Sequence, residues 1–491
     1  MRKKVSMILV SLMMVSAFAA CGNIDSSKDL SMNEVSAEST EDELEEAFSK
    51  KSSSDTNEED NDSKSLETAE SSDDAINEDS DNVSSEGDKD SSNSLLTTAN
   101  VTSDGMIDAT DMFTDRDLEQ TADLSSAEKY TLSDGEDITI TSEGVYVISG
   151  QASEVTIYVE AGDEDKVQIV LDSATISNES RPAIYVKSAD KVFVTTTESD
   201  NTLEVTGTFE TAASFETVDT AESLDSSVTT EESGANLDAV IFSKDDLVIN
   251  GVGTLNISSS DNAVTSKDTL KITGSTINVS CTGNAFEAHD AIEVADGTIN
   301  IASCNDGLHA ENDEDDSVGY IYICGGTFNI TASDDAIHAT TIVQIDSSNM
   351  NLTGAECIEG TYIQINGGDI TINASDDGIN AASKSSEYTP TFEMNDGTLK
   401  VTMGAGDTDG IDSNGNIYVN GGTIDVSGQS TFDYDGEAQY NGGTIIENGT
   451  ETNTISNQMM GGGPGSFDGG GFGGGQDGGI GGGDFGGPHG H

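Results

Sequence analysis

The sequence predicts an all-β protein whose central part is a parallel β-helix with coils of about 21 residues. Three observations support this prediction. A five-residue phrase recurs between Asn262 and Ser413, short runs of alternating apolar and polar residues separate its copies, and helix signals are nearly absent.

The recurring phrase has an acidic or amide residue first, an aliphatic residue third and usually another polar residue fourth. Successive copies begin 22, 22, 29, 21, 21 and 32 residues apart, at Asn262, Asn284, Asp306, Asp335, Glu356, Asp377 and Asp409. A repeat near this length, with insertions, is typical of a solenoid that has one supersecondary unit per repeat. If the units stack, the first residues form one column and the fourth residues form a second.

The segments between the copies carry strand signals. Asp296-Gly-Thr-Ile-Asn-Ile301 places alternating apolar residues after a turn, and Tyr362-Ile-Gln-Ile365 is a further run of the same kind. Each repeat therefore offers about three short strands separated by tight turns. We expect the aliphatic side chains to point into the bore of the coil and the polar ones outward. A β-sandwich is the competing fold, but strands this short with this period argue against it.

Composition divides the chain into regions. A basic start, an apolar run and the small residues before Cys21 indicate a signal peptide of the lipoprotein type at 1–20, with Cys21 as the lipidated residue. Ordinary secretion with cleavage near Ala20 is the alternative. Residues 21–128 read as a disordered, acidic, Ser-rich tether, 129–455 as the β-helix with an acidic insertion at 208–236, and 456–491 as a flexible Gly-rich tail. The sequence leaves open how the remaining cysteines pair: Cys281, Cys304, Cys324 and Cys357.

The charge balance restricts the partners. The chain has 92 acidic and 19 basic residues, a formal net charge of −73. Nucleic acid is excluded as a partner because its phosphates would be repelled. We expect an exported monomer at the bacterial cell surface that faces cations and contacts the membrane only through its lipid anchor.

An ordered series of motifs resembles a known family. The series includes Gly144-Val-Tyr-Val-Ile-Ser-Gly150, Val167-Gln-Ile-Val-Leu-Asp172, Ser375-Asp-Asp-Gly-Ile-Asn-Ala-Ala382 and Asp409-Gly-Ile-Asp-Ser-Asn-Gly415, followed by the Gly-rich tail. It is similar to exported bacterial carbohydrate-binding proteins over roughly residues 130–455. The resemblance implies a right-handed parallel β-helix like that of polysaccharide lyases, calcium binding, and recognition of cellulose or of acidic polysaccharides such as polygalacturonate. Cys357 departs from the family pattern, which usually has glycine there.

The two columns indicate a calcium site. Stacked carboxylates repel one another unless a cation lies between them, and ligands that are all oxygens suit calcium. The densest predicted cluster is Glu356, Glu359, Asp376 and Asp377. Further candidate ligands are Asp334, Asp335 and Asp306 in the preceding repeats, and Asp409 and Asp412 near a second predicted site. Asp-Gly turns that cap backbone N–H groups are the alternative explanation. We expect His309 and His338 to be solvated members of the second column and not a zinc site.

Three functions compete. The first is calcium-dependent polysaccharide binding, with Tyr362, Tyr322 and Tyr418 as candidate residues for stacking on sugar rings, although they are equally compatible with ordinary outward-facing strand positions. The second is a polysaccharide lyase, which needs a base. Lys384 is the only basic residue near the predicted cluster, and its serine neighbours indicate a mobile loop. The third is an adhesin or spacer. The lack of a well-placed base favours binding over catalysis.

Overall fold

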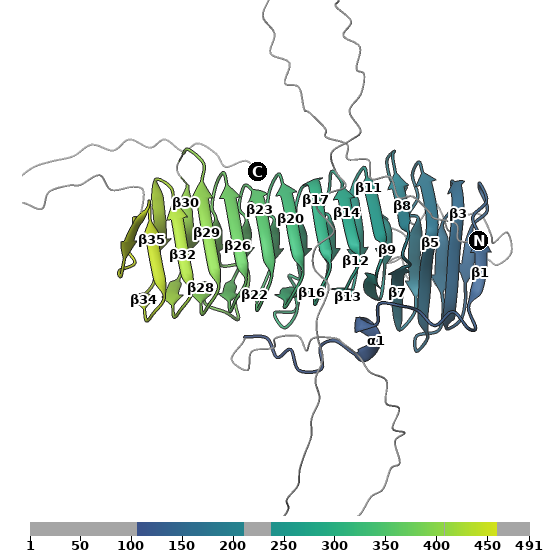
Figure 1. Cartoon of the computed structure of the whole chain (residues 1–491), viewed down its shortest axis with the longest axis horizontal. Helices are drawn as coiled ribbons and strands as arrows, with labels where there is room; N and C mark the ends of the chain where they lie inside the picture. Colours follow the sequence, from purple (N-terminus) through teal and green to yellow (C-terminus); the bar gives the residue numbers. More distant parts are fainter. Residues whose placement is uncertain (1–105, 211–236, 407, 459–491) are drawn as a thin grey trace, which may run out of the picture. The chain divides into compact units, whose positions relative to one another are not determined.

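The chain folds into three faces of parallel strands that stack coil upon coil (Figure 1). A computed structural model describes residues 106–210, 237–406 and 408–458. From β9 to β32, each strand pairs in parallel with the strand three places later in the chain. One coil therefore consists of three strands, and this pairing is that of a parallel β-solenoid. The all-β prediction is confirmed, and the right-handed winding stays a prediction.

The 24-stranded sheet forms two of the faces. Face 1 consists of β1 (Glu128–Thr131), β3 (Gly144–Ser153), β5 (Lys166–Asn178), β7 (Lys191–Thr196), β10 (Asp246–Gly251), β13 (Thr269–Ile272), β16 (Ala291–Val294), β19 (Tyr320–Ile323), β22 (Ile342–Ile345), β25 (Tyr362–Ile365), β28 (Thr391–Met394), β31 (Asn416–Val419) and β34 (Ala438–Tyr440). Face 2 consists of β8 (Asp200–Val205), β11 (Thr254–Ser259), β14 (Thr276–Ser280), β17 (Thr298–Cys304), β20 (Thr327–Ala332), β23 (Asn349–Gly354), β26 (Asp369–Ala374), β29 (Thr398–Met403), β32 (Thr423–Ser427) and β35 (Thr444–Glu447). The antiparallel strand β36 (Thr450–Thr452) follows β35.

The 12-stranded sheet is face 3, and it carries the recurring phrase. Its strands are β2 (Ile138–Ile140), β4 (Ile157–Glu160), β6 (Ile184–Ser188), β9 (Ala239–Ser243), β12 (Asn262–Ser266), β15 (Phe286–Ala288), β18 (Leu308–Ala310), β21 (Ile337–Ala339), β24 (Ile358–Gly360), β27 (Ile379–Ala381), β30 (Asp409–Ser413) and β33 (Ser430–Tyr434).

The third residue of each phrase lies in the hydrophobic bore. Phe286 pairs in register with Leu308, and Leu308 pairs with Ile337. All three side chains are fully buried. Burying a side chain of this size stabilises a fold by about 1.5–3 kcal/mol. The aliphatic position in the repeat therefore holds the coils in register, because a one-residue slip would turn it toward solvent.

The N-terminal boundary differs from the predicted one. Residues 106–127 are not part of a tether but pack on face 1 and include the helix α1 (Asp115–Leu118). Thr114 and Asp117 form a capping box at the start of this helix. The fully buried carboxylate of Asp117 lies 3.5 Å from Lys191 Nζ, and the Gln120 side chain donates to the carbonyl of Thr273. We call residues 106–127 the N-terminal strap.

Other sequence predictions fall outside the described residues. These are the signal peptide at 1–20 with Cys21, the tether up to residue 105, most of the insertion at 208–236 and the tail from residue 459. Within the part that the structure describes, the remaining four cysteines are buried free thiols. Cys281 and Cys304 lie near each other. Burial raises the pKa of both thiols, and the neighbouring Cys281 further raises that of Cys304. Unreactive core thiols are the result.

Candidate functional site

The second predicted column exists on face 3. Register pairs connect Thr265, Glu287, His309, His338, Glu359, Asn380, Asp412 and Asp433 in that order. Every residue pairs with the equivalent one of the next coil, so the spacing of the column is that between adjacent strands, about 4.8 Å. The stacking that the repeat predicts is therefore confirmed.

The first column acts largely as a backbone cap. Asn284 N–H donates to Asn262 Oδ1 at 2.7 Å, and Asp306 N–H donates to Asn284 Oδ1 at 3.3 Å. Asp335 N–H continues the ladder with a bond of 3.0 Å to Asp306 Oδ1. Each side chain thus satisfies a backbone donor of the following coil. One carboxylate oxygen of Asp306 is committed to this turn, as the alternative to calcium binding expects.

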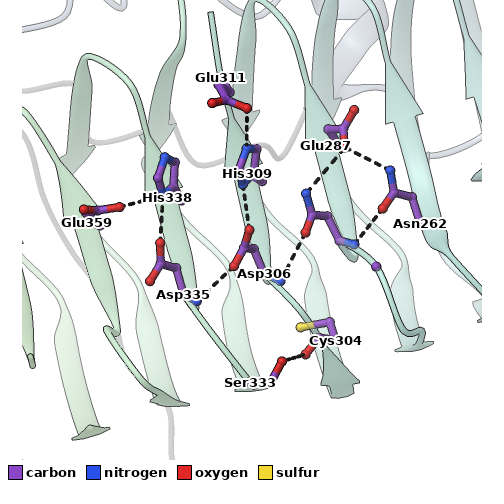
Figure 2. A network of polar contacts seen from close by, with 12 residues as sticks. Asn262, Glu287, Cys304, Asp306, His309, Glu311, Ser333, Asp335, His338 and Glu359 are labelled. Atoms are coloured by element: carbon purple, nitrogen blue, oxygen red, sulfur yellow. Dashed lines mark hydrogen bonds and ion pairs between the residues drawn. The ribbon is translucent and has the colours of Figure 1, made fainter. Parts of the chain in front are cut away.

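The histidines of the second column are not solvated, contrary to our expectation. His338 is 9 % exposed, and its Nδ1 lies 2.7 Å from Asp335 Oδ2 and 2.8 Å from Glu359 Oε2 (Figure 2). The ring of His309 stacks on it with centroids 4.6 Å apart and an interplanar angle of 8°. Burial opposes a charge on His338, but the hydrogen bonds to Asp335 and Glu359 raise its pKa to about 10. The sequence pattern missed this pair because each histidine looks like one more polar turn residue.

Lys384 completes the surroundings of Glu359. Its Nζ lies 2.9 Å from Glu359 Oε1, and although burial opposes the charge, this ion pair raises the pKa of Lys384. The adjoining segment is fixed, because Ser385 donates its hydroxyl proton to Asp316 and its N–H to Thr361 Oγ1. Hydrogen bonds therefore hold the segment that the serines led us to expect as a mobile loop. An ion-paired ammonium with a raised pKa is a poor base at neutral pH.

The predicted four-carboxylate cluster divides into two parts. Glu359 turns toward His338 and Lys384, and these contacts lower its pKa to about 2 although burial opposes the shift. Glu356 lies between the parts: burial raises its pKa to about 7, and its Oε2 accepts a hydrogen bond from Asn380. Asp376 is exposed at its turn, as is Asp334 of the preceding turn.

The second part is a group of carboxylates that influence one another. Asp412 pairs in register with Asp433, and Asp377 Oδ1 accepts the N–H of Asp409. Burial and then the charges of Asp377, Asp433 and Asp409 raise the pKa of Asp412 to about 7. Burial and then the charges of Asp409, Asp376 and Asp433 raise the pKa of Asp377 to about 6. We call Asp377, Asp409, Asp412 and Asp433 the aspartate group.

This group fits a hard cation. Its donor set consists only of oxygens and comes from successive coils that a regular ladder holds at fixed spacing. In addition, the buried hydroxyls of Thr408 and Ser430 have no hydrogen-bond partner among the residues that the structure describes, and Ser430 pairs in register with Asp409. Polar atoms without partners beside repelling carboxylates are the surroundings that a bound calcium ion would satisfy.

The candidate tyrosines lie in different surroundings. Tyr322 presents no face to solvent, because it is fully buried against the N-terminal strap and donates its hydroxyl to Asp346 at 2.8 Å. The prediction that it stacks on a sugar is therefore corrected. Tyr362 is half-buried and donates to Glu393 Oε2 at 2.7 Å, and Tyr418 is half-buried on β31 of the same face.

Face 2 carries a regular array of amides that our sequence reading did not single out. The side-chain amides of five asparagines form a ladder with N···O distances of 2.8, 2.9, 2.9 and 3.2 Å, which connects Asn256, Asn278, Asn300, Asn329 and Asn351. A row of threonines runs beside it two residues earlier in each strand, at Thr254, Thr276, Thr298 and Thr327. The recurring Thr-x-Asn pattern was the available signal. These two rows contain no charged side chain, which sets them apart on so acidic a chain.

This chain is similar to proteins that are already known. The family model for carbohydrate-binding domain-containing proteins matches residues 134–410 and 354–454. A carbohydrate-binding domain-containing protein of Acetivibrio thermocellus is 30 % identical over 140 residues, which are 28 % of this chain and 43 % of that protein. The chain thus spans less than half the length of this relative. The polysaccharide lyase-like protein from C. thermocellum, solved as a gadolinium derivative, is 27 % identical with a TM-score of 0.37, and the match covers 50 % of this chain and 93 % of that one.

In the described ranges, no helix has the length and apolar character needed to cross a membrane. The family match spans both the acidic columns of face 3 and the amide ladder of face 2. The chain belongs to the family of carbohydrate-binding domain-containing proteins.

Proposed function

We propose that this protein binds an acidic polysaccharide, such as polygalacturonate, through calcium held by the aspartate group. The observation that carries the proposal is the raised pKa of Asp412 and Asp377, which reflects partly buried carboxylates whose strongest charged neighbours are other carboxylates. Asp377, Asp409, Asp412 and Asp433 would hold the ion. Bound calcium would supply positive charge to sugar carboxylates, which this acidic surface would otherwise repel.

Binding is a better proposal than a lyase reaction. Lys384, the base that we considered, is fixed by Glu359 and carries a raised pKa. It also adjoins Glu359, which pairs with His338, and not the aspartate group. The third possibility, an adhesin or spacer without a defined glycan, does not explain why successive coils retain closely spaced carboxylates.

A pull-down assay with insoluble polygalacturonate tests the proposal. The wild-type chain should sediment with the polymer in millimolar calcium and stay soluble in excess EGTA. Asp412→Asn combined with Asp433→Asn should abolish calcium-dependent sedimentation, whereas Asp425→Asn, on β32 of face 2, should not. Unsaturated products and reducing ends are measured in the same tubes. Retention that ignores calcium, or products that disappear in Lys384→Ala, would contradict the proposal.

The amide ladder supports a second candidate ligand, a neutral polysaccharide such as cellulose. The inner asparagines Asn278, Asn300 and Asn329 each use one amide proton and one oxygen lone pair within the ladder, which leaves a further donor and acceptor on each of them. Such an array matches the hydroxyl groups of an uncharged sugar polymer. Asn300→Ala with Asn329→Ala should weaken sedimentation with cellulose and leave calcium-dependent sedimentation with polygalacturonate unchanged. The reverse pattern would exclude face 2 as this binding surface.

We further propose that the protein is an exported lipoprotein at the bacterial cell surface. The support is the sequence before Cys21, which lies outside the described residues. Metabolic labelling with a palmitate analogue should mark the wild-type chain, and Cys21→Ser should abolish both the label and the membrane association. An unlabelled wild-type chain in the culture medium would instead indicate ordinary secretion.

A further inference from the structure

The cluster around His338 has a chemistry that differs from that of the aspartate group. One ligand atom each from Asp335, His338 and Glu359 lies within 4.8 Å of the other two. Two of the atoms are carboxylate oxygens and one is an imidazole nitrogen. Calcium prefers oxygen ligands, whereas a mixed set of nitrogen and oxygen suits zinc and similar divalent transition metals.

From this geometry we propose that Asp335 Oδ2, His338 Nδ1 and Glu359 Oε2 form a binding site for a divalent transition metal such as zinc, separate from the calcium site. The inference does not rest on the proposed function. The ion would connect two adjacent coils, because Asp335 precedes β21 and His338 lies on it, while Glu359 lies on β24.

The distances are compatible with such an ion. Nδ1 lies 2.7 Å from Asp335 Oδ2 and 2.8 Å from Glu359 Oε2, as it does when a proton is shared among them. Zinc bonds of about 2.0–2.2 Å in tetrahedral geometry place ligand atoms about 3.3–3.6 Å apart. The two nitrogen–oxygen separations therefore need to widen by about 0.5–0.9 Å. When zinc binds, His338 Nδ1 releases its proton to solvent and directs its lone pair at the metal.

Neighbouring groups already orient the three ligands. Glu359 Oε1 accepts from Lys384 at 2.9 Å and from Asn380 at 3.3 Å, which leaves Oε2 directed at His338. The backbone N–H of Asp335 is held by Asp306. The stacked ring of His309 fixes the plane of His338. Partners of this kind hold the ligands of natural metal sites in place.

The alternative is an imidazolium that serves only as a counter-ion for two buried carboxylates. The two possibilities differ in a measurable way. If His338 is only a counter-ion, the cluster binds no zinc. If the cluster is a metal site, the same three side chains bind zinc and His338 Nδ1 gives up its proton.

Isothermal titration of the EDTA-treated, full mature chain with zinc distinguishes them. All variants carry His489→Gln and His491→Gln, so that the terminal histidines do not compete. We expect one zinc ion per chain in the presence of excess calcium. His338→Gln should weaken binding by ~100-fold or more, because loss of an outer-sphere partner alone typically costs 10–100-fold. His289→Gln is the matched control, since His289 is an exposed histidine on the turn after β15, and it should bind like wild type.

Diffraction from zinc-soaked crystals of the chain with native His338 provides the second measurement, which does not depend on whether His338→Gln folds. An anomalous peak bonded to Nδ1 and to both carboxylates is expected. Zinc affinity that is unchanged in His338→Gln, absence of zinc binding, or a peak only at other residues would overturn the proposal.

Discussion

Replacing Asp412 by asparagine tests the electrostatics of the aspartate group directly. The amide keeps the size of the side chain and removes one charge from the set formed with Asp377, Asp409 and Asp433. Without calcium the change should stabilise the fold at pH 8. With calcium it should remove most of the stabilisation that the ion provides.

The magnitude follows from the pKa of Asp412. In the folded chain this pKa is raised from 3.8 to about 7. Between pH 3.8 and about pH 7, the folded state therefore keeps a proton that the unfolded state has released. Stability therefore falls as the pH rises through this window, and the full penalty is present above pH 7. A shift of this size corresponds to roughly 4 kcal/mol if the side chain were fully desolvated. Because Asp412 is only half-buried, solvent screening reduces the expected gain in Asp412→Asn to ~1–2 kcal/mol.

Urea unfolding in EGTA at pH 4 and pH 8 measures this gain. The variant and the wild type should have similar free energies of unfolding at pH 4, where the carboxyl group is protonated in the folded state. The difference should appear at pH 8 and diminish when calcium is added. Asp425→Asn, on β32 of face 2, serves as the control and should not reproduce the gain at pH 8. If Asp412→Asn were less stable than wild type in EGTA at pH 8, the carboxylate would be a structural hydrogen-bond acceptor and our electrostatic reasoning would be refuted.

Three further predictions concern the scaffold. Phe392→Ala removes a fully buried ring from the bore and should lower the free energy of unfolding by about 3–5 kcal/mol in the same urea assay, with a much smaller loss contradicting tight packing. Asp117→Ala leaves the ammonium of Lys191 without its buried partner and should speed hydrogen exchange in residues 106–127, while exchange in the coils stays slow; a uniform effect would contradict a locally held strap. Gly251→Ala should destabilise the fold, because the backbone φ is +117° and an added Cβ would lie 2.3 Å from the carbonyl oxygen of Thr196; a melting temperature equal to that of wild type would argue against this turn geometry.

The regular features of the molecule were predictable because each depends on one periodic position. The third residue of the phrase is always apolar and small enough for the bore, so the sequence alone indicates parallel coils in register. The fourth residue follows from the same alternation, and the column through His309, His338 and Glu359 has the predicted order. Repetition converts a weak local signal into a firm one.

The irregular features were not predictable for the same reason. Lys384 reaches Glu359 from an insertion between two coils, and its distance along the chain says nothing about that contact. The burial of Tyr322 depends on the N-terminal strap, whose composition resembles the acidic region before it. The repeat predicts contacts between equivalent positions of adjacent coils. It does not predict the contacts of Lys384 and Tyr322, because these involve segments outside the repeat.

The second column changes in chemistry along its length while its backbone stays the same. Glu287 accepts from Asn262 and Lys267, His338 lies between two carboxylates, and the coils from Asp377 onward place carboxylates against one another. Neighbouring side chains compensate the charges of Glu287 and His338 with hydrogen bonds and ion pairs. The carboxylates from Asp377 onward are compensated least. A solenoid tolerates this gradient because each coil contacts only its neighbours, so the energetic cost of repelling charges stays local. The end of the column where carboxylates repel one another is therefore where an added cation would contribute most to stability, and our proposal assigns calcium to that end instead of to Glu356 and Glu359.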